Sequence, residues 1–130
     1  MTSSTVTSAS SLPYACPALD QNIKTESIIN GTICIGQYND QLGSAGYYYY
    51  GGPSTVGHVE LGNGYNLWPG GACDAGTAFA NTSNVTMTSS YYEEYISAYN
   101  LVYGGEYTGT WWDYNGSSYS NWGTVCGTWY

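Results

Sequence analysis

The sequence predicts an all-β fold, an antiparallel β-sandwich or jelly-roll-like domain with several tight hairpins and at most one short helix. Short runs of β-branched and aromatic residues recur along the chain, and glycine-containing turn signals separate them. The chain has 130 residues, which is the usual size of one domain. We therefore expect a single disulfide-stabilised β domain over residues 14–130, preceded by a Ser/Thr-rich N-terminal arm over residues 1–13.

Three glycine-containing turns predict hairpins, because a type I′ turn requires positive φ at its two central residues and Asn and Gly tolerate it. The turns and the runs that they join are Asn63-Gly64 between His58–Leu61 and Tyr65–Trp68, Gly104-Gly105 between Tyr99–Tyr103 and Glu106–Thr110, and Asn115-Gly116 between Trp111–Tyr114 and Ser117–Trp122. Together these turns predict antiparallel pairing.

Two further segments are typical of strands. Ile33–Tyr38 is short, apolar and β-branched, and Tyr47–Tyr50 ends at Gly51-Gly52-Pro53, where proline prevents a central strand from continuing. Ser90–Tyr103 fits both a helical stripe and an alternating strand pattern. We favour a strand there, since Tyr, Ile, Asn, Ser and Val are mediocre helix formers, but the helix stays open as the alternative.

The charge balance excludes two classes of partner. Lys24 is the only cation of the chain, and the nine carboxylates give a formal net charge of −8. Nucleic acids and anionic membrane surfaces are bound by clusters of Lys and Arg, so we expect neither as a partner. The sequence also lacks an apolar run of the length that membrane insertion requires.

Four cysteines predict two disulfides, because none of them forms the closely spaced C-x-x-C pair that is typical of zinc sites. Of the three connectivities that four cysteines allow, we favour Cys16–Cys34 with Cys73–Cys126, which ties each end of the domain to a neighbouring region. Disulfides predict an extracellular location, as a secreted, cell-surface or virion-surface protein.

N-x-[ST] sequons support the extracellular location and predict N-glycosylation. The predicted acceptors are Asn30, Asn81, Asn84 and Asn115. The segment Met1–Val6 has neither the basic nor the apolar region of a signal peptide. We therefore expect a processed form or another route out of the cell.

The sequence offers little material for catalysis, and we expect no enzyme activity, no cofactor and no metal. His58 is the only histidine, and there is no G-x-S-x-G motif around a serine. Glycoside hydrolysis needs two carboxylates, for which Glu60, Glu93, Glu94 and Glu106 are available. Asp113 begins a fragment of calcium-loop spacing that lacks the terminal bidentate Glu, and it fits the flank of a hairpin turn better.

Aromatic clusters are the remaining candidates for binding. Their ordinary use is in the core and in cross-strand pairs. Four consecutive tyrosines, however, place two side chains on each face of a strand, and a solvent-facing pair would suit a sugar ring or another subunit. The residues that we expect to contact another subunit or a glycan are Val6, Tyr47, Tyr48, Tyr49, Tyr50, Trp111, Trp112 and Trp129.

The N-terminal arm suggests how subunits would join. Residues 2–11 contain only Val6 and Ala9 as apolar side chains, which cannot offset an ordering cost of about 1–2 kcal/mol per residue. Backbone hydrogen bonds to an open sheet edge would supply the remaining stabilisation, and Thr and Val suit an added strand. The edge would belong to a neighbouring subunit or, alternatively, to the same chain.

Three classes of function remain. The favoured one is a non-enzymatic structural subunit of an extracellular filament, capsid or surface layer, which forms a homo-oligomer or polymer through the arm and the aromatic surfaces. The alternative is a secreted carbohydrate-binding or lectin-like module, for which glycans are the partners. A secreted toxin or effector is neither supported nor excluded.

Overall fold

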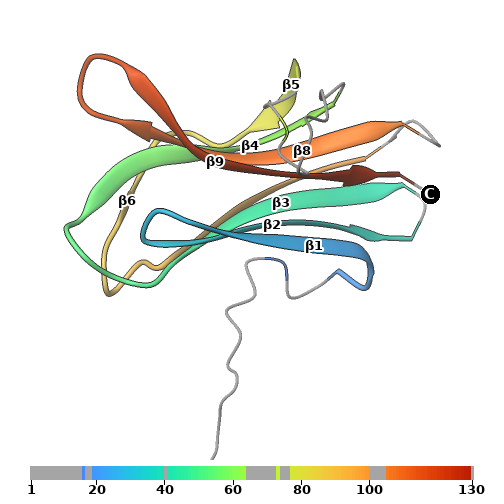
Figure 1. Ribbon diagram of the computed structural model, residues 1–130, viewed down its shortest axis with the longest axis horizontal. Coiled ribbons are helices and arrows are strands. Elements are labelled where there is room, and N and C mark those ends of the chain that lie inside the picture. Colours follow the sequence, from blue (N-terminus) through green and yellow to red (C-terminus); the bar gives the residue numbers. More distant parts are fainter. Residues whose placement is uncertain are drawn as a thin grey trace, which may run out of the picture.

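The computed structural model describes Cys16, residues 19–39, 41–63, Cys73, 77–99 and 105–129, so the predicted arm lies outside the described residues. The strands of the described residues are β1 (Gln21–Ile28), β2 (Gly31–Tyr38), β3 (Leu42–Tyr49), β4 (Thr55–Asn63), β5 (Thr77–Asn81), β6 (Val85–Met87), β7 (Glu93–Ala98), β8 (Glu106–Tyr114) and β9 (Tyr119–Thr128). They form two antiparallel sheets in facing layers (Figure 1). The prediction of an antiparallel β-sandwich is confirmed.

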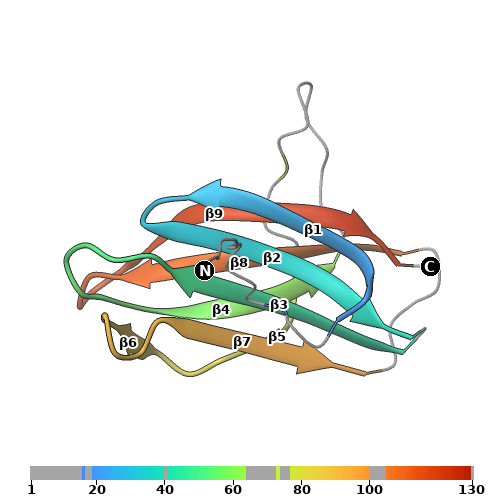
Figure 2. The same ribbon diagram turned by 90° about the horizontal axis from the view of Figure 1, so that it is seen from below.

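The first sheet has the order β1-β2-β3-β7, and the second has the order β5-β4-β8-β9, with β6 also paired to β4. The sheets face one another so that β1 lies over β9, β3 over β8 and β7 over β4 (Figure 2). The order β2-β3-β7 opposite β9-β8-β4 is the strand order of immunoglobulin-like sandwiches. Because such sandwiches carry many unrelated functions, this order says nothing about what the chain does.

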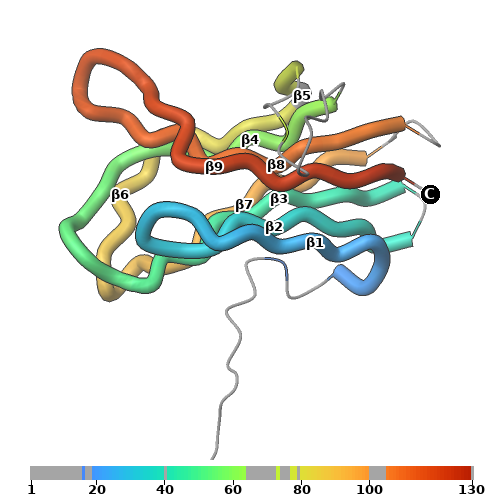
Figure 3. Tube along the Cα trace, viewed as in Figure 1, coloured from blue at the N-terminus to red at the C-terminus, as the bar shows by residue number. Residues whose placement is uncertain are grey.

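One of the three predicted hairpins is confirmed. Strands β8 and β9 pair from Glu106↔Thr128 to Tyr114↔Tyr119, and they project together at one end of the sandwich (Figure 3). Gly116 has a φ of +103°, as a turn glycine does, but the loop has four residues rather than two. The side-chain Oδ1 of Asn115 accepts hydrogen bonds from the backbone N–H groups of Ser117 and Ser118, each 2.9 Å away, and this closes the wider loop.

The other two predicted hairpins are wrong. Both sides of β4 between Glu60 and Asn63 are already occupied, by β5 and by β8, and Tyr65–Trp68 lies outside the described residues. The Gly104-Gly105 segment links β7 of the first sheet to β8 of the second, so it joins two layers and not two neighbouring strands. A turn motif in the sequence indicates that the chain changes direction, but it does not determine which sheet the next strand joins.

The ambiguous segment Ser90–Tyr103 contains strand β7, as favoured, and the described part of the chain has no helix. Residues 100–103 of this segment lie outside the described residues. Among the described residues, no helix is long and apolar enough to cross a membrane.

The core explains why the chain uses so much tyrosine. The ring of Tyr47 stacks on Trp111 with centroids 4.5 Å apart, and the ring of Tyr107 stacks on Trp129 at 3.6 Å. The two tyrosine hydroxyls donate hydrogen bonds to backbone carbonyls of the β1–β2 hairpin, 2.8 and 3.0 Å away. Tyrosine thus fills the space between the sheets while its polar end is satisfied at the rim.

The sheets approach each other closely beside Gly109 on β8. A Cβ atom there would lie 2.6 Å from the side chain of Ile35 and 3.0 Å from that of Ala45, both on the opposite sheet. Only glycine fits this position without moving a sheet. The apolar side chains buried in the core between the sheets include Ile33, Ile35, Ala45, Val59, Leu61, Met87 and Val125.

Both predicted disulfides are confirmed. Cys16 is bonded to Cys34 on β2, and Cys73 is bonded to Cys126 on β9. Each bond therefore ties a segment outside the strands to one of the two sheets. Two disulfides indicate folding in an oxidising environment.

Candidate functional site

Side chains of the four-tyrosine run alternate between the two faces of the first sheet. Tyr47 and Tyr49 are buried in the core, whereas Tyr48 and Tyr50 lie on the outer face. Trp111 and Trp129 are also buried in the core, and Trp112 faces outward from β8. An outward role in contacting a partner or a glycan therefore remains a prediction for Tyr48, Tyr50 and Trp112, and Val6 lies outside the described residues.

Four tyrosines of the first sheet, three of them in ring contact, make up what we call the tyrosine face: Tyr48, Tyr50, Tyr92 and Tyr95. The ring of Tyr48 lies 5.9 Å from that of Tyr50 and 5.2 Å from that of Tyr92. Tyr95 stands opposite Gly46 in the β3–β7 pair, two positions from Tyr48, so it projects from the same face. The exposed fractions of Tyr50, Tyr92 and Tyr95 are 57%, 48% and 55%.

Within the tyrosine face, the surroundings of Tyr48 favour the neutral form of its hydroxyl. Desolvation raises the pKa of Tyr48, and the neighbouring Tyr92 and the Glu93 carboxylate raise it further. A neutral phenol both donates and accepts hydrogen bonds, so the face combines apolar rings with polar ends. Tyr95 lies on β7, which is the last strand of its sheet among the described residues, so the tyrosine face reaches that edge.

On the outer face of the second sheet, the structure buries a carboxylate. Glu60 on β4 is only 8% exposed. The indole Nε1–H of Trp112 on the neighbouring strand donates a hydrogen bond to the Oε1 atom of Glu60 at 2.8 Å. The Oε2 atom of Glu60 has no hydrogen-bond partner among the described residues. Desolvation raises the pKa of Glu60, and the Trp112 hydrogen bond and the nearby His58 oppose this only in part.

Replacing Glu60 with glutamine should raise the melting temperature at pH 7. A group whose folded-state pKa is raised contributes its stability below its unfolded pKa and loses it as pH rises, so ionised Glu60 weakens the fold at pH 7. Glutamine keeps an acceptor for Trp112 without a buried charge, and we expect a gain of about 1 kcal/mol in the free energy of unfolding. Thermal melts between pH 4 and pH 8 measure it.

The control for this variant is Glu106→Gln, which removes the same charge from an exposed position at the start of β8. The gain of Glu60→Gln should disappear near pH 4, where the wild-type carboxyl becomes protonated. A gain that stays constant down to pH 4, or that Glu106→Gln reproduces, would contradict this account of Glu60.

Beside Glu60, the only histidine is part of an aromatic cluster with an amide at its edge. The ring of His58 packs edge-on against Tyr119 with centroids 5.0 Å apart, and Tyr114 lies 4.8 Å from Tyr119. The Oδ1 atom of Asn84 lies 3.1 Å from the Tyr119 hydroxyl and 3.3 Å from His58 Nδ1. This cluster brings together residues of β4, β8, β9 and the β5–β6 connection.

The carboxylates considered for glycoside hydrolysis are distributed over both sheets. Glu60 lies on the outer face of the second sheet, and Glu93 stands opposite Tyr48 on the outer face of the first. Glu94 accepts a hydrogen bond from the hydroxyl of Tyr91, and Glu106 is exposed at the start of β8. Glu60 and Glu93 therefore face away from each other, on opposite sides of the molecule.

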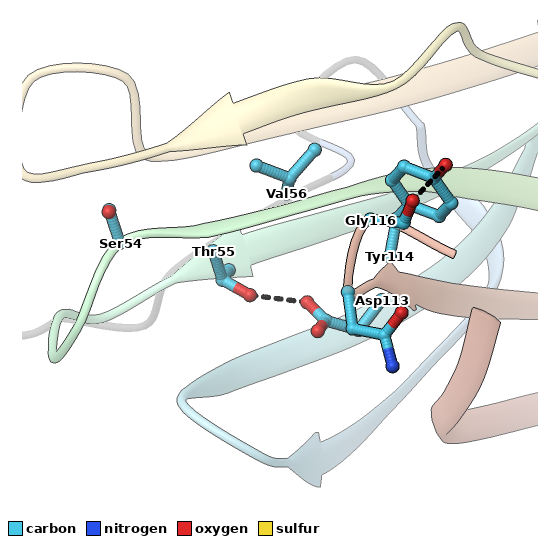
Figure 4. Close-up of a pocket in the computed structure, with 7 residues that line it drawn as sticks. Ser54, Thr55, Val56, Asp113, Tyr114 and Gly116 are labelled. Atoms are coloured by element: carbon cyan, nitrogen blue, oxygen red, sulfur yellow. Dashed lines mark hydrogen bonds between the residues drawn. The ribbon is translucent and has the colours of Figure 1, made fainter. Parts of the chain in front are cut away.

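Asp113 lines an open pocket of about 450 Å³ between the start of β4 and the β8–β9 loop (Figure 4). Its Oδ1 accepts a hydrogen bond from the hydroxyl of Thr55 and lies 3.5 Å from the indole nitrogen of Trp111. Within the described ranges, no group of three His, Cys, Asp or Glu side chains could hold a metal ion. Asp113 thus caps buried groups at the end of the sandwich.

Comparison with known proteins gives no relative. No family model, curated protein or solved structure matches this chain. The function therefore has to be argued from the surfaces that the chain itself presents.

Sequence reasoning missed the part that Tyr92, Tyr95, Asn84 and Tyr119 play in these surfaces. The alternation of Tyr95 within Ser90–Tyr103 was a usable signal, since it places Tyr95 on one face of a strand. Nothing in the sequence, however, showed that this strand pairs with β3 and joins the tyrosine run. The clusters around Glu60 and Asn84 also depend on which strands are neighbours.

Proposed function

We propose that this chain is an extracellular structural subunit that assembles with copies of itself into a filament, a capsid or a surface layer. The observation that carries the proposal is the tyrosine face, a set of half-exposed aromatic rings beside the edge strand β7. Aromatic residues are enriched at protein interfaces, and exposed aromatic surfaces of this kind are typical of contact sites.

The edge strands of the two described sheets provide a second means of assembly. The first sheet ends at β1 and β7, and the second ends at β9 on one side. An exposed strand edge is a template for pairing with another chain. In the proposed assembly, residues 2–11 of one subunit add a strand to such an edge of the next subunit.

The charge of the chain fits contacts made by phenol rings. With one cation and nine carboxylates, copies of this chain cannot be joined by a network of ion pairs, and they repel one another at low salt. Tyrosine rings can make contacts without a partner charge, and the one carboxylate that pairs with the tyrosine face in the β3–β7 register is Glu93, opposite Tyr48. Salt should therefore favour assembly, because it screens the repulsion.

The double variant Tyr92→Ser and Tyr95→Ser should assemble about thirtyfold less readily, because two aromatic contacts near the centre of an interface, at about 1 kcal/mol each, together contribute about 2 kcal/mol. Sedimentation velocity over a concentration series measures the concentration at which half of the chain is assembled. The matched control is Tyr119→Ser, which removes a tyrosine of 46% exposure from the other sheet.

Thermal melts of the variants at a concentration where the chain is monomeric show whether each remains folded. If the double variant is folded and assembles as well as the wild type, the tyrosine face is not an interface. If the Tyr119→Ser control loses assembly equally, the effect is not specific to this face.

The alternative is a secreted carbohydrate-binding module. The observation that favours it is the outward cluster of His58, Trp112 and Tyr119 on the second sheet, which combines aromatic rings with amide and carboxylate oxygens. Small-molecule sites typically combine apolar surface with a few fixed polar groups. A monodisperse monomer that is retained on a glycan column would support this function and exclude assembly.

The extracellular location, at a secreted, cell-surface or virion-surface site, is part of the proposal. The disulfides support it, and so do the sequons at Asn30, Asn81, Asn84 and Asn115.

A further inference from the structure

The sequons of this chain differ in what surrounds the acceptor amide. The Oδ1 atom of Asn115 is held by Ser117 and Ser118 of its own loop. Asn30 is half-buried in the β1–β2 turn with a φ of +58°. Asn84 is exposed, and its Oδ1 is held by aromatic side chains from two other strands, at 3.1 Å from the Tyr119 hydroxyl and 3.3 Å from His58 Nδ1.

We propose that Asn84 carries an N-linked glycan whose first sugar packs against the exposed aromatic surface of Tyr119, so that the glycan stabilises the fold. The hydroxyl group that an acceptor sequon requires is supplied by Thr86, which is exposed on β6. The inference concerns the single subunit, so it holds whether or not the chain assembles.

The modification leaves the observed contacts intact. A transferase joins the Asn84 amide nitrogen to the anomeric carbon of a sugar that is activated as a glycosyl pyrophosphate. The new C–N bond replaces the C–O bond to the pyrophosphate, which leaves with the electron pair, and the amide gives up one proton to a base of the transferase. The Oδ1 atom takes no part, so it still accepts hydrogen bonds from Tyr119 and His58.

The same contacts determine where the sugar lies. Because Oδ1 accepts a hydrogen bond from the Tyr119 hydroxyl, the amide nitrogen that carries the sugar lies next to this side chain, and the sugar can pack against its ring. Tyr119 retains an exposed fraction of 46%, and its neighbour Tyr114 extends the aromatic surface with a centroid 4.8 Å away. A sugar ring has an apolar face that can cover such a surface and remove it from water.

The test uses Thr86→Ala, which abolishes the sequon but keeps Asn84 and its hydrogen bonds. The full chain is produced in a secretory host that glycosylates N-x-[ST] sequons and in a bacterial host that does not. Mass spectrometry after enzymatic release of glycans in heavy-oxygen water shows which asparagines were occupied. Thermal melts of both forms then separate the effect of the glycan from that of the threonine.

We expect Asn84 to be occupied, and Thr86→Ala to lower the melting temperature of the glycosylated protein by about 3 °C more than that of the bacterial protein. Ser83→Ala, which abolishes the neighbouring Asn81 sequon, is the matched control and should give no such difference. In the Tyr119→Ala background, the extra loss caused by Thr86→Ala should disappear.

Three results would overturn the inference. Asn84 could be unoccupied in the protein from the secretory host. Thr86→Ala could lower both melting temperatures equally. The contribution of the glycan could also persist in the Tyr119→Ala background, which would mean that the sugar does not pack on this ring. None of these results bears on self-assembly, which is measured separately on the protein without glycans.

Discussion

Removal of the disulfide between Cys73 and Cys126 should lower the free energy of unfolding by roughly 4 kcal/mol. The bond joins residues 53 apart in the sequence, and it links a segment between β4 and β5 to the outer strand β9 of the second sheet. Its loss frees a long loop in the unfolded chain, which gains more entropy than a short loop would. Urea unfolding of the double variant Cys73→Ala and Cys126→Ala measures the change.

The other disulfide provides the matched comparison. Cys16 and Cys34 are 18 residues apart, and the same entropy argument gives a loss of roughly 3 kcal/mol for Cys16→Ala with Cys34→Ala. The sheets should retain their order in both variants, because neither bond passes through the core between them. If removal of the Cys16–Cys34 disulfide lowered the free energy of unfolding more than removal of Cys73–Cys126, native-state contacts around Cys34 would contribute more than the chain entropy does.

Deletion of residues 2–11 should abolish assembly and leave the subunit folded. The buried core of the described residues is formed by side chains from Ile33 to Trp129, all of which follow the arm in the sequence. Without the arm, a subunit has no strand to add to the open edge of its neighbour. Sedimentation velocity measures the loss of large species, and the thermal melt shows that the remaining monomer is folded.

Two outcomes would contradict this role of the arm. Normal assembly of the truncated chain would mean that residues 2–11 are dispensable. Unfolding of the truncated monomer would mean that the arm completes a sheet of its own subunit. A variant with the same ten positions replaced by a Gly/Ser sequence is the control for chain length, and it should fail to assemble as well.

The features that could be predicted from sequence are those that depend on short stretches of chain. The alternation of the tyrosine run and the β-branched pattern of Ile33–Tyr38 correspond to β3 and β2. The Asn115-Gly116 turn gives the β8–β9 hairpin, because its strands are consecutive. The disulfide pairing was also correct, although spacing alone left two other connectivities open.

The predictions that were wrong or missing concern features that depend on which strands pair with each other. Strand β1 was missed because Gln21–Ile28 is an edge strand with mostly exposed polar side chains, so it shows little of the apolar pattern of a strand. The hairpin predicted at Gly104-Gly105 failed because consecutive strands pair in different sheets here. The burial of Glu60 could not be read from its neighbours in the sequence, since Trp112 reaches it from another strand.

The same limit applies to the proposed interface. Tyr48 and Tyr50 were expected as contact residues, but Tyr92 and Tyr95 join them only because β7 pairs with β3. Conversely, Tyr47 and Trp111 were grouped with the contact residues, and they stack on each other inside the core. Identifying a surface from aromatic content thus required the sheet order.

The mass distribution of the full chain in solution tests the central claim most directly. Sedimentation velocity over a range of protein and salt concentrations, with negative-stain images of the same samples, shows whether a 14.0 kDa subunit forms larger particles. We predict rods, shells or sheets of many copies, favoured by salt. A single monomeric species at every concentration, with no ordered particles in the images, would contradict the proposal that this chain is a structural subunit.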